Sequence, residues 1–383
     1  GISDKEMVSA TQKVDMEKLI AAAPVVSIEE ALQGQLGGVD IVLGGDPGSR
    51  SAIRIRGTST LNASSDPLIV IDGVPYPTEI SDDFNFSTAT EEDLGALLNI
   101  SPNDIASVEV LKDASATAIY GSKGANGVVL INTKRGKIGA PSVNFRVEHS
   151  ISEPTKLPEF IGAADHMALL NELTEDRTRL PFSQEQIDRT RYGYDRDLYP
   201  DVNWLDQITK DYAYSTRANL TVSGGSDFLR YSLVGSYFGE KGIMETDKTL
   251  PYDTGMKLTR YNMRANVDLD VTKTTVLRLN VGGFLQTHRK QAFSTDNAFD
   301  RAFMTSPFVH PARYSDGTIP IMNINGVNPW AAVTQSGYDV VTASQIQSLF
   351  AVEQNLKMIT PGLKAKVSFS FDRCKSGKTR RAD

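Results

Sequence analysis

The feature that most constrains the fold is a strict alternation of apolar and polar residues that begins near residue 143. Successive side chains of a β-strand point to opposite faces, so an alternating segment is a strand with one apolar and one polar side. Residues 262–271 show the pattern, with Met263, Ala265, Val267, Leu269 and Val271 on one face and Asn262, Arg264, Asn266, Asp268 and Asp270 on the other. Alternating segments of about ten residues are typical of transmembrane β-barrels, whose outer side meets lipid.

The alternation recurs along the chain and predicts seven strands, over residues 143–151, 216–223, 228–238, 261–271, 276–287, 345–359 and 363–371. Short connectors alternate with long ones, which cover 152–211, 239–258 and 290–343. Outer-membrane barrels have short periplasmic turns and long extracellular loops. We therefore expect the first strand and every second strand after it to run outward, and the others to run inward.

The expected strand number bears on how much of a barrel this chain supplies. Bacterial single-chain barrels close with an even number of strands, and a barrel with a plugged lumen has about 22 strands. Seven strands are too few to close such a barrel, so we expect this chain to be the N-terminal portion of a longer protein. The last residues, 373–383, break the alternation with a cationic run, which is either the start of an outer loop or sequence joined across a gap.

The first part of the chain has a different pattern, with short strands separated by turn-forming residues. Strands are expected at Leu68–Ile71, Ile105–Leu111 and around 128–131, and Asp72-Gly73 supplies turn chemistry after the first of them. Asp113 can cap a helix over residues 114–120 that ends at Gly121. These elements predict a compact α+β domain over residues 27–140, preceded by a lead-in segment, 1–26, and followed by the barrel strands, 141–383.

The motifs of this region resemble a known family. The stretches "SIEEALQGQLGGVDI", "IRIRGTST", "DPLIVIDGVP" and "SPNDIASVEVLKDASATAIYGSKGANGVVLINT" are similar, in order and approximate spacing, to the plug domain of SusC/RagA-like TonB-dependent outer-membrane transporters. The resemblance covers about residues 28–133, and "YPDVNWLDQ" at 199–207 adds to it. It implies an α+β plug domain followed by antiparallel transmembrane β-barrel strands in the Gram-negative outer membrane.

The same resemblance implies a function and partners. Family members import nutrients, commonly oligosaccharides and sometimes oligopeptides, with a SusD-like surface lipoprotein as a lid and TonB as the source of energy. A dimer of transporter–lid pairs and contact with outer-membrane lipid are further expectations. The family's TonB-contacting segment, usually near a "GYG" stretch, is not recognisable before Ser27. No catalytic residue, cofactor or metal is implied.

An acidic insertion between Tyr76 and Asn99 holds the candidate substrate-binding residues of the plug. Asp82, Asp83 and Asn85 offer hydrogen-bonding groups, and Phe84 and Phe86 offer apolar faces for a sugar ring or a peptide side chain. A solvated loop is the simpler alternative. Catalysis by the paired carboxylates would require a fixed separation in one cleft, which adjacent residues do not supply.

Other local patterns favour structural roles. The glycine-rich 44–50 stretch lacks the Gly-Lys-Ser/Thr ending of a phosphate-binding loop, and His166 next to Asp165, in an expected helix over Ala163–Leu173, lacks a second ligand at helical spacing. Trp204 and Trp330 fit packing or interface roles equally well. A single Cys374 excludes an intramolecular disulfide, and a net charge of −7 without a basic block argues against nucleic acid as a partner.

Two further classes of protein remain as alternatives at this level. A secreted β-rich binding or adhesion protein would explain the alternating strands and acidic loops, although not the plug motifs. A carbohydrate-active enzyme would need two carboxylates at a fixed separation, which the sequence does not establish.

Overall fold

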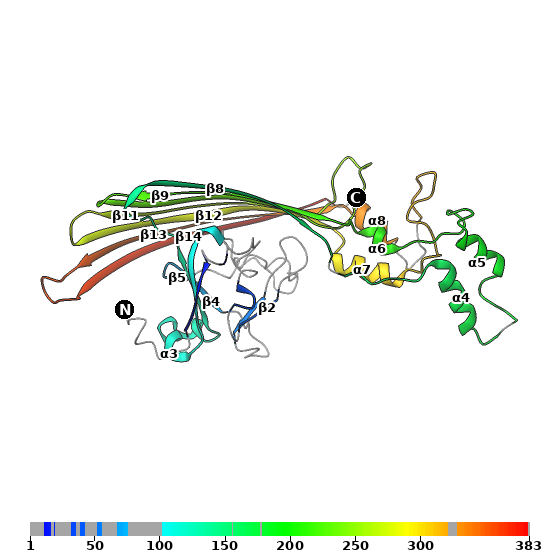
Figure 1. Cartoon of the computed structure of the whole chain (residues 1–383), viewed down its shortest axis with the longest axis horizontal. Helices are drawn as coiled ribbons and strands as arrows, with labels where there is room; N and C mark the ends of the chain where they lie inside the picture. Colours follow the sequence, from blue (N-terminus) through cyan, green and yellow to red (C-terminus); the bar gives the residue numbers. More distant parts are fainter. Residues whose placement is uncertain are drawn as a thin grey trace.

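The structure is a computed structural model that describes residues 11–16, 19, 32–35, 39–42, 52–55, 67–75, 102–154, 156–176, 178–320 and 328–381. Two parts are evident in Figure 1: a long, curved antiparallel sheet, and a smaller α+β domain that lies against one face of that sheet. We call the sheet the wall and the smaller domain the plug.

The wall consists of seven strands in the order β14-β13-β12-β11-β10-β9-β8, each hydrogen-bonded to its sequence neighbour. Their bounds are β8 Gly139–Ser152, β9 Ala213–Gly225, β10 Leu229–Lys241, β11 Lys257–Asp270, β12 Thr275–Gln291, β13 Tyr338–Asn355 and β14 Lys364–Arg381. All seven predicted strands are confirmed, and most are longer than predicted. The cationic run after residue 372 continues β14, with Arg373 to Arg381 paired in register along β13, so the prediction of an outer loop there was wrong.

The two faces of the wall differ as the alternation predicts. On β11, Met263 is 75% exposed, whereas Asn266 on the opposite face is 2% exposed. Asn280 of β12 is likewise buried, and its apolar neighbours Leu279 and Val281 are exposed. The polar face is thus the one that meets the plug, and the apolar face points away from it (Figure 1).

The connectors also follow the prediction, because short turns lie at one end of the wall and long, partly helical connectors at the other (Figure 1). The long connectors contain α4 Ala163–Leu173, α5 Gln184–Arg191, α6 Trp204–Ile208, α7 Thr295–Met304 and α8 Pro329–Gln335. Side chains of Ser183, Asn203, Ser294 and Asn328 accept backbone hydrogen bonds at the N-termini of α5 to α8, respectively.

Helices from different connectors share one hydrophobic cluster. Trp204 is 3% exposed and packs with Leu205, Ile208, Met244, Met256, Ala298, Ala302 and Val333. Trp330 packs against this cluster, and the guanidinium of Arg313 lies 4.9 Å from the centroid of its ring. Both tryptophans therefore act as packing anchors that join connectors distant in sequence.

The plug is built on a five-stranded sheet in the order β1-β6-β7-β4-β5. The strands are β1 Thr11–Asp15, β4 Leu68–Ile71, β5 Val74–Pro75, β6 Ile105–Leu111 and β7 Val128–Thr133. The 3-10 helices η2 Pro102–Asp104 and η3 Ala118–Gly124 and the helix α3 Ala114–Thr117 surround it, and β2 Val39–Val42 pairs separately with β3 Ala52–Ile55. Its core contains Met16, Leu32, Ile41, Ile69, Ile71, Ile105, Val108, Val110, Val129 and Ile131.

Two details of the plug differ from the sequence prediction. The predicted lead-in segment, 1–26, contributes β1, which pairs antiparallel with β6 along the whole of Thr11–Asp15. The segment TQKVD has little apolar alternation, and it forms a strand because the edge of β6 offers backbone partners. The predicted 114–120 helix is divided into α3 and η3, and Gly121 takes a positive φ of 61° within η3.

No helix in the described part of the chain is both long enough and apolar enough to cross a membrane.

Candidate functional site at the plug–wall interface

In the part of the plug that the structure describes, the contacts with the wall are mainly polar. They come from the turn after β4 at Asp72, the 3-10 helix η2 at Asp104, and the residues that follow β7. The wall contributes inward-facing side chains of β11 and β12. The alternation that exposes apolar groups on one face is what places polar groups opposite the plug.

A chain of hydrogen bonds connects the β4 turn to β11. Asp72 has a positive φ of 50°, and its carboxylate accepts hydrogen bonds from the Thr133 backbone N–H at 3.0 Å and from Thr133 Oγ1 at 2.6 Å. The amide Nδ2 of Asn266 donates to Thr133 Oγ1 and to the carbonyl oxygen of Lys134, each at 2.8 Å. Asn266 is 2% exposed, so these bonds are shielded from water while the plug stays docked.

Arg135 extends this network along the wall. Its Nη1 donates to Asp268 Oδ1 at 3.0 Å, and its Nη2 lies 3.8 Å from Asp72 Oδ1. With the Asn280 amide turned so that its oxygen faces the guanidinium, Asn280 accepts from Arg135 Nη2 at 3.0 Å. One plug cation thus bridges a plug carboxylate and two neighbouring wall strands.

A buried ion pair forms the third connection. Asp104 of η2, which is 3% exposed, pairs with Arg264 of β11, whose side chain is 10% exposed. Burial raises the pKa of Asp104 from 3.8 to about 6, the nearby Arg264 opposes the rise, and the Asp72 carboxylate adds to it. Its Oδ1 has no hydrogen-bond partner within the described ranges. Desolvation therefore outweighs the attraction to Arg264 at this pair.

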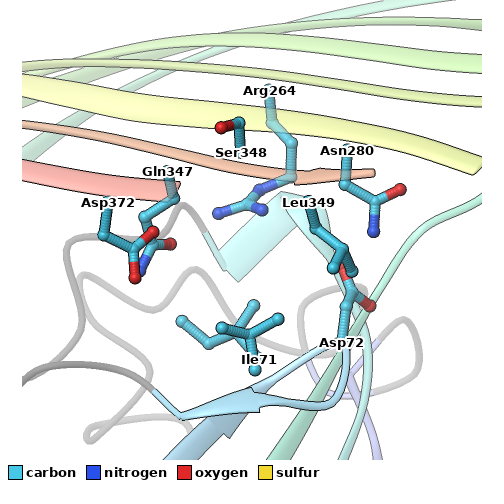
Figure 2. A pocket seen from close by; sticks show the side chains of 9 residues that line it. Ile71, Asp72, Arg264, Asn280, Gln347, Ser348, Leu349 and Asp372 are labelled. Carbon is cyan, nitrogen blue, oxygen red and sulfur yellow. The ribbon is translucent and has the colours of Figure 1, made fainter. Parts of the chain in front are cut away.

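A small cavity of about 20 Å³, room for about one water molecule, lies next to this pair. Figure 2 shows Arg264, Asn280 and Gln347 extending from the wall toward Ile71 and Asp72 of the plug. The remaining lining residues are Val74, Ser348, Leu349 and Asp372. A polar and incompletely packed interface can exchange its side-chain contacts for water, so the plug can shift against the wall at lower cost than across an apolar seam.

The structure does not test the predicted substrate-binding residues. Asp82, Asp83, Phe84, Asn85 and Phe86 lie outside the described residues, so their prediction stays untested. His166 lies 5.3 Å from Phe308, ring centroid to ring centroid, in an edge contact. The described residues contain no group of three or more metal-ligating side chains.

The sequence predicted the wall side of this interface but not the plug side. It placed Arg264, Asn266 and Asp268 on the inward face of a strand, but it did not connect them to Asp72, Asp104 and Arg135. The available signal was the position of these plug residues, which stand at strand ends where side chains leave the plug core.

Comparisons with known proteins agree with this fold. Residues 3–128 match the family described as TonB-dependent Receptor Plug Domain. TonB-dependent receptor P3 of Formosa agariphila is 30% identical over 365 residues, which are 92% of this chain and 31% of that protein. TonB-dependent receptor SusC of Bacteroides thetaiotaomicron is 34% identical over 232 residues, 60% of this chain and 21% of that protein.

Among solved structures, the RagAB peptide importer in its closed-closed state superposes with a TM-score of 0.73 at 22% identity, over 98% of this chain and 42% of that chain. A plug docked on the polar face of an antiparallel wall defines a TonB-dependent receptor. Within that class, its relatives place the chain with the SusC/RagA-like TonB-dependent receptors. The match to TonB-dependent receptor P3 covers most of this chain, but it spans only 31% of the length of that relative.

Proposed function

We propose that the full-length protein imports oligosaccharides across the Gram-negative outer membrane in a TonB-dependent manner. The observation that supports this most is the plug–wall interface. A domain held in place by Asn266 and Arg135 closes a passage, and its polar contacts permit release when force is applied.

The outer membrane is the expected location because the outward face of the wall is apolar. Met263, Val367 and Phe369 are each at least 70% exposed on this face, a pattern that favours lipid over water as the surrounding medium. A secreted binding protein would present such a face only if a partner covered it.

The substrate class follows from the family resemblance, which implies oligosaccharides for most members. Oligopeptides are the second candidate, supported by the likeness to a structure described as a peptide importer. Within the plug, we place the substrate floor at the acidic insertion, with Asp82, Asp83 and Asn85 as hydrogen-bonding groups and Phe84 and Phe86 as apolar platforms.

The partners in this proposal are a SusD-like lipoprotein lid and TonB, with a dimer of transporter–lid pairs as the assembled form. The lid would contact the long connectors, because their helices form a packed unit around Trp204 at the outer end of the wall (Figure 1). No enzymatic step is part of the proposal.

Uptake of labelled oligosaccharides and oligopeptides by cells that carry or lack the gene tests the function directly. We expect saturable uptake of oligosaccharides that disappears when TonB is deleted. Uptake that is unaffected by TonB would contradict the mechanism, and uptake of peptides alone would replace the substrate class. Alanine at Phe84, Asn85 and Phe86 together should weaken substrate binding without changing assembly, and unchanged affinity would remove these residues from the site.

A further inference from the structure

Three cations lie side by side on the outward face of the wall, near the ends of strands that lead into the long connectors. Lys241 of β10 is the register partner of Lys257 of β11, and Lys257 is in turn the partner of Arg289 of β12. Lys257 is six residues from the exposed Met263, so it points away from the plug. We call these three residues the cationic row.

The cationic row is an unusual arrangement for a sheet. Directly opposed residues of antiparallel strands have Cβ atoms only about 4.5–5.5 Å apart, and like charges in these positions destabilise the pair. The row contains two such pairs in succession, Lys241 with Lys257 and Lys257 with Arg289. The stability of the sheet therefore does not explain it, and an anion held between the three cations would remove the repulsion.

One member of the row is held in a fixed position. The guanidinium of Arg289 lies 5.0 Å from the ring centroid of Tyr338, and its Nη1 lies 3.6 Å from Asp253 Oδ2. Asp253 is 62% exposed, and Arg289 is the cation of the row with which it pairs. Both lysine side chains are exposed, so an anion can reach them from outside the wall.

The height of the cationic row along the strands indicates what kind of anion it meets. Tyr237 and Tyr261 lie four residues away on β10 and β11, toward the short turns, and their ring centroids are 5.3 Å apart. Exposed apolar residues continue beyond them, including Met263, Leu279 and Val281. Tyrosines border the lipid-facing band of a membrane barrel. Four residues are roughly 13 Å along a strand, so the row stands at the level of the lipid headgroups.

We propose that Lys241, Lys257 and Arg289 bind the phosphate groups of a phosphorylated lipid in the outer leaflet. This inference depends on the outer-membrane location in the proposed function. Lysine and arginine both bind phosphate strongly, and long cationic side chains at a membrane boundary reach headgroups readily. A lipid fits better than a soluble anion, because the row is continuous with the apolar band that acyl chains would cover.

The test uses the full-length transporter in detergent and two probes: diphosphorylated lipid A, and the same glycolipid after removal of both phosphates. Wild type should bind the phosphorylated probe more tightly. The double variant K241Q/K257Q should bind it about 30-fold more weakly, since each cation near an anionic lipid surface contributes roughly a fivefold gain. The matched control K273Q/K357Q removes the same charge from exposed lysines in the short turns at the other end of the wall, and should bind as wild type does.

A second measurement separates lost binding from lost folding. Without phosphorylated lipid, K241Q/K257Q should unfold at the same temperature as wild type or a higher one, because the repulsion within the row is relieved. K241R/K257R should keep its affinity for lipid. Equal affinity of wild type for the two probes, or full affinity in K241Q/K257Q, would overturn the proposal.

Cell fractionation distinguishes this failure from that of the proposed function. If the protein is found in the outer membrane but binds both probes equally, only the lipid site is contradicted. A protein absent from the outer membrane contradicts both.

Discussion

Replacing Asn266 by alanine should loosen the plug from the wall. Asn266 is 2% exposed and donates two hydrogen bonds of 2.8 Å to the plug, to Thr133 Oγ1 and the Lys134 carbonyl. Each such bond contributes about 1 kcal/mol net, so the loss of both should cost roughly 2 kcal/mol. A change of this size corresponds to about 30-fold faster opening of the plug edge.

Hydrogen exchange of the β7 backbone amides in the full-length transporter measures this opening. The Asn266→Ala variant should exchange these amides about 30-fold faster, while Thr259→Ala, on the outward face of the same strand, should leave them unchanged. A double-mutant cycle with Thr133→Val should give a coupling energy of about 1 kcal/mol. Unchanged exchange in Asn266→Ala, or a coupling energy near zero, would refute the assignment of these bonds as the ones that hold the plug.

Three other predictions follow from the wall, the ion pair and the connectors. Val267→Arg or Leu279→Arg should each make insertion into the membrane less favourable by about 2–4 kcal/mol, whereas Ser236→Arg on the inward face should assemble. Equal yields of all three, measured by surface labelling, would contradict the assigned facing of the wall. The docked plug raises the pKa of Asp104 from 3.8 to about 6, so protonated Asp104 should favour docking by about 3 kcal/mol. This contribution should be full below pH 3.8 and lost as the pH rises through about 6. Hydrogen exchange at pH 5 and 7.5 should show tighter docking at pH 5, and a difference that persists in Asp104→Asn would assign the effect to another group. Trp204→Ala should destabilise the packed connectors by about 3–5 kcal/mol. Proteolysis near α6 and α7 should then be faster while the wall stays intact, and unchanged proteolysis would contradict the role of Trp204 as a packing anchor.

The wall could be predicted almost completely because its physical determinants are local. Alternation at positions such as Met263 and Arg264 fixes both the strand and its facing, and neighbouring strands joined by short turns must pair. The structure extended the strands at their ends, where pairing with a neighbour continues after the apolar alternation has stopped. The end of β14 shows this clearly, since Arg373 to Arg381 pairs along β13 without an apolar face.

The plug core was also predictable from runs such as Leu68–Ile71, because an apolar run between turn residues requires burial. The β1 strand was not, since its pairing is determined by the backbone of β6 and not by its own side chains. The same limitation applies to the interface. That Asp104 meets Arg264, and Thr133 meets Asn266, depends on how two separately folded parts dock, because the partners are 160 and 133 positions apart in the sequence.

A reversible covalent link between plug and wall tests the central claim most directly. In the full-length transporter with Cys374→Ser, the pair Thr133→Cys and Asn266→Cys replaces two side chains that are hydrogen-bonded across the interface. The account predicts that a short bis-methanethiosulfonate reagent joins the two cysteines, that oligosaccharide uptake then stops, and that a reductant restores it, while each single variant continues to import. Failure of the pair to cross-link, or undiminished uptake by the cross-linked protein, would contradict a plug that docks here and must leave this position for transport.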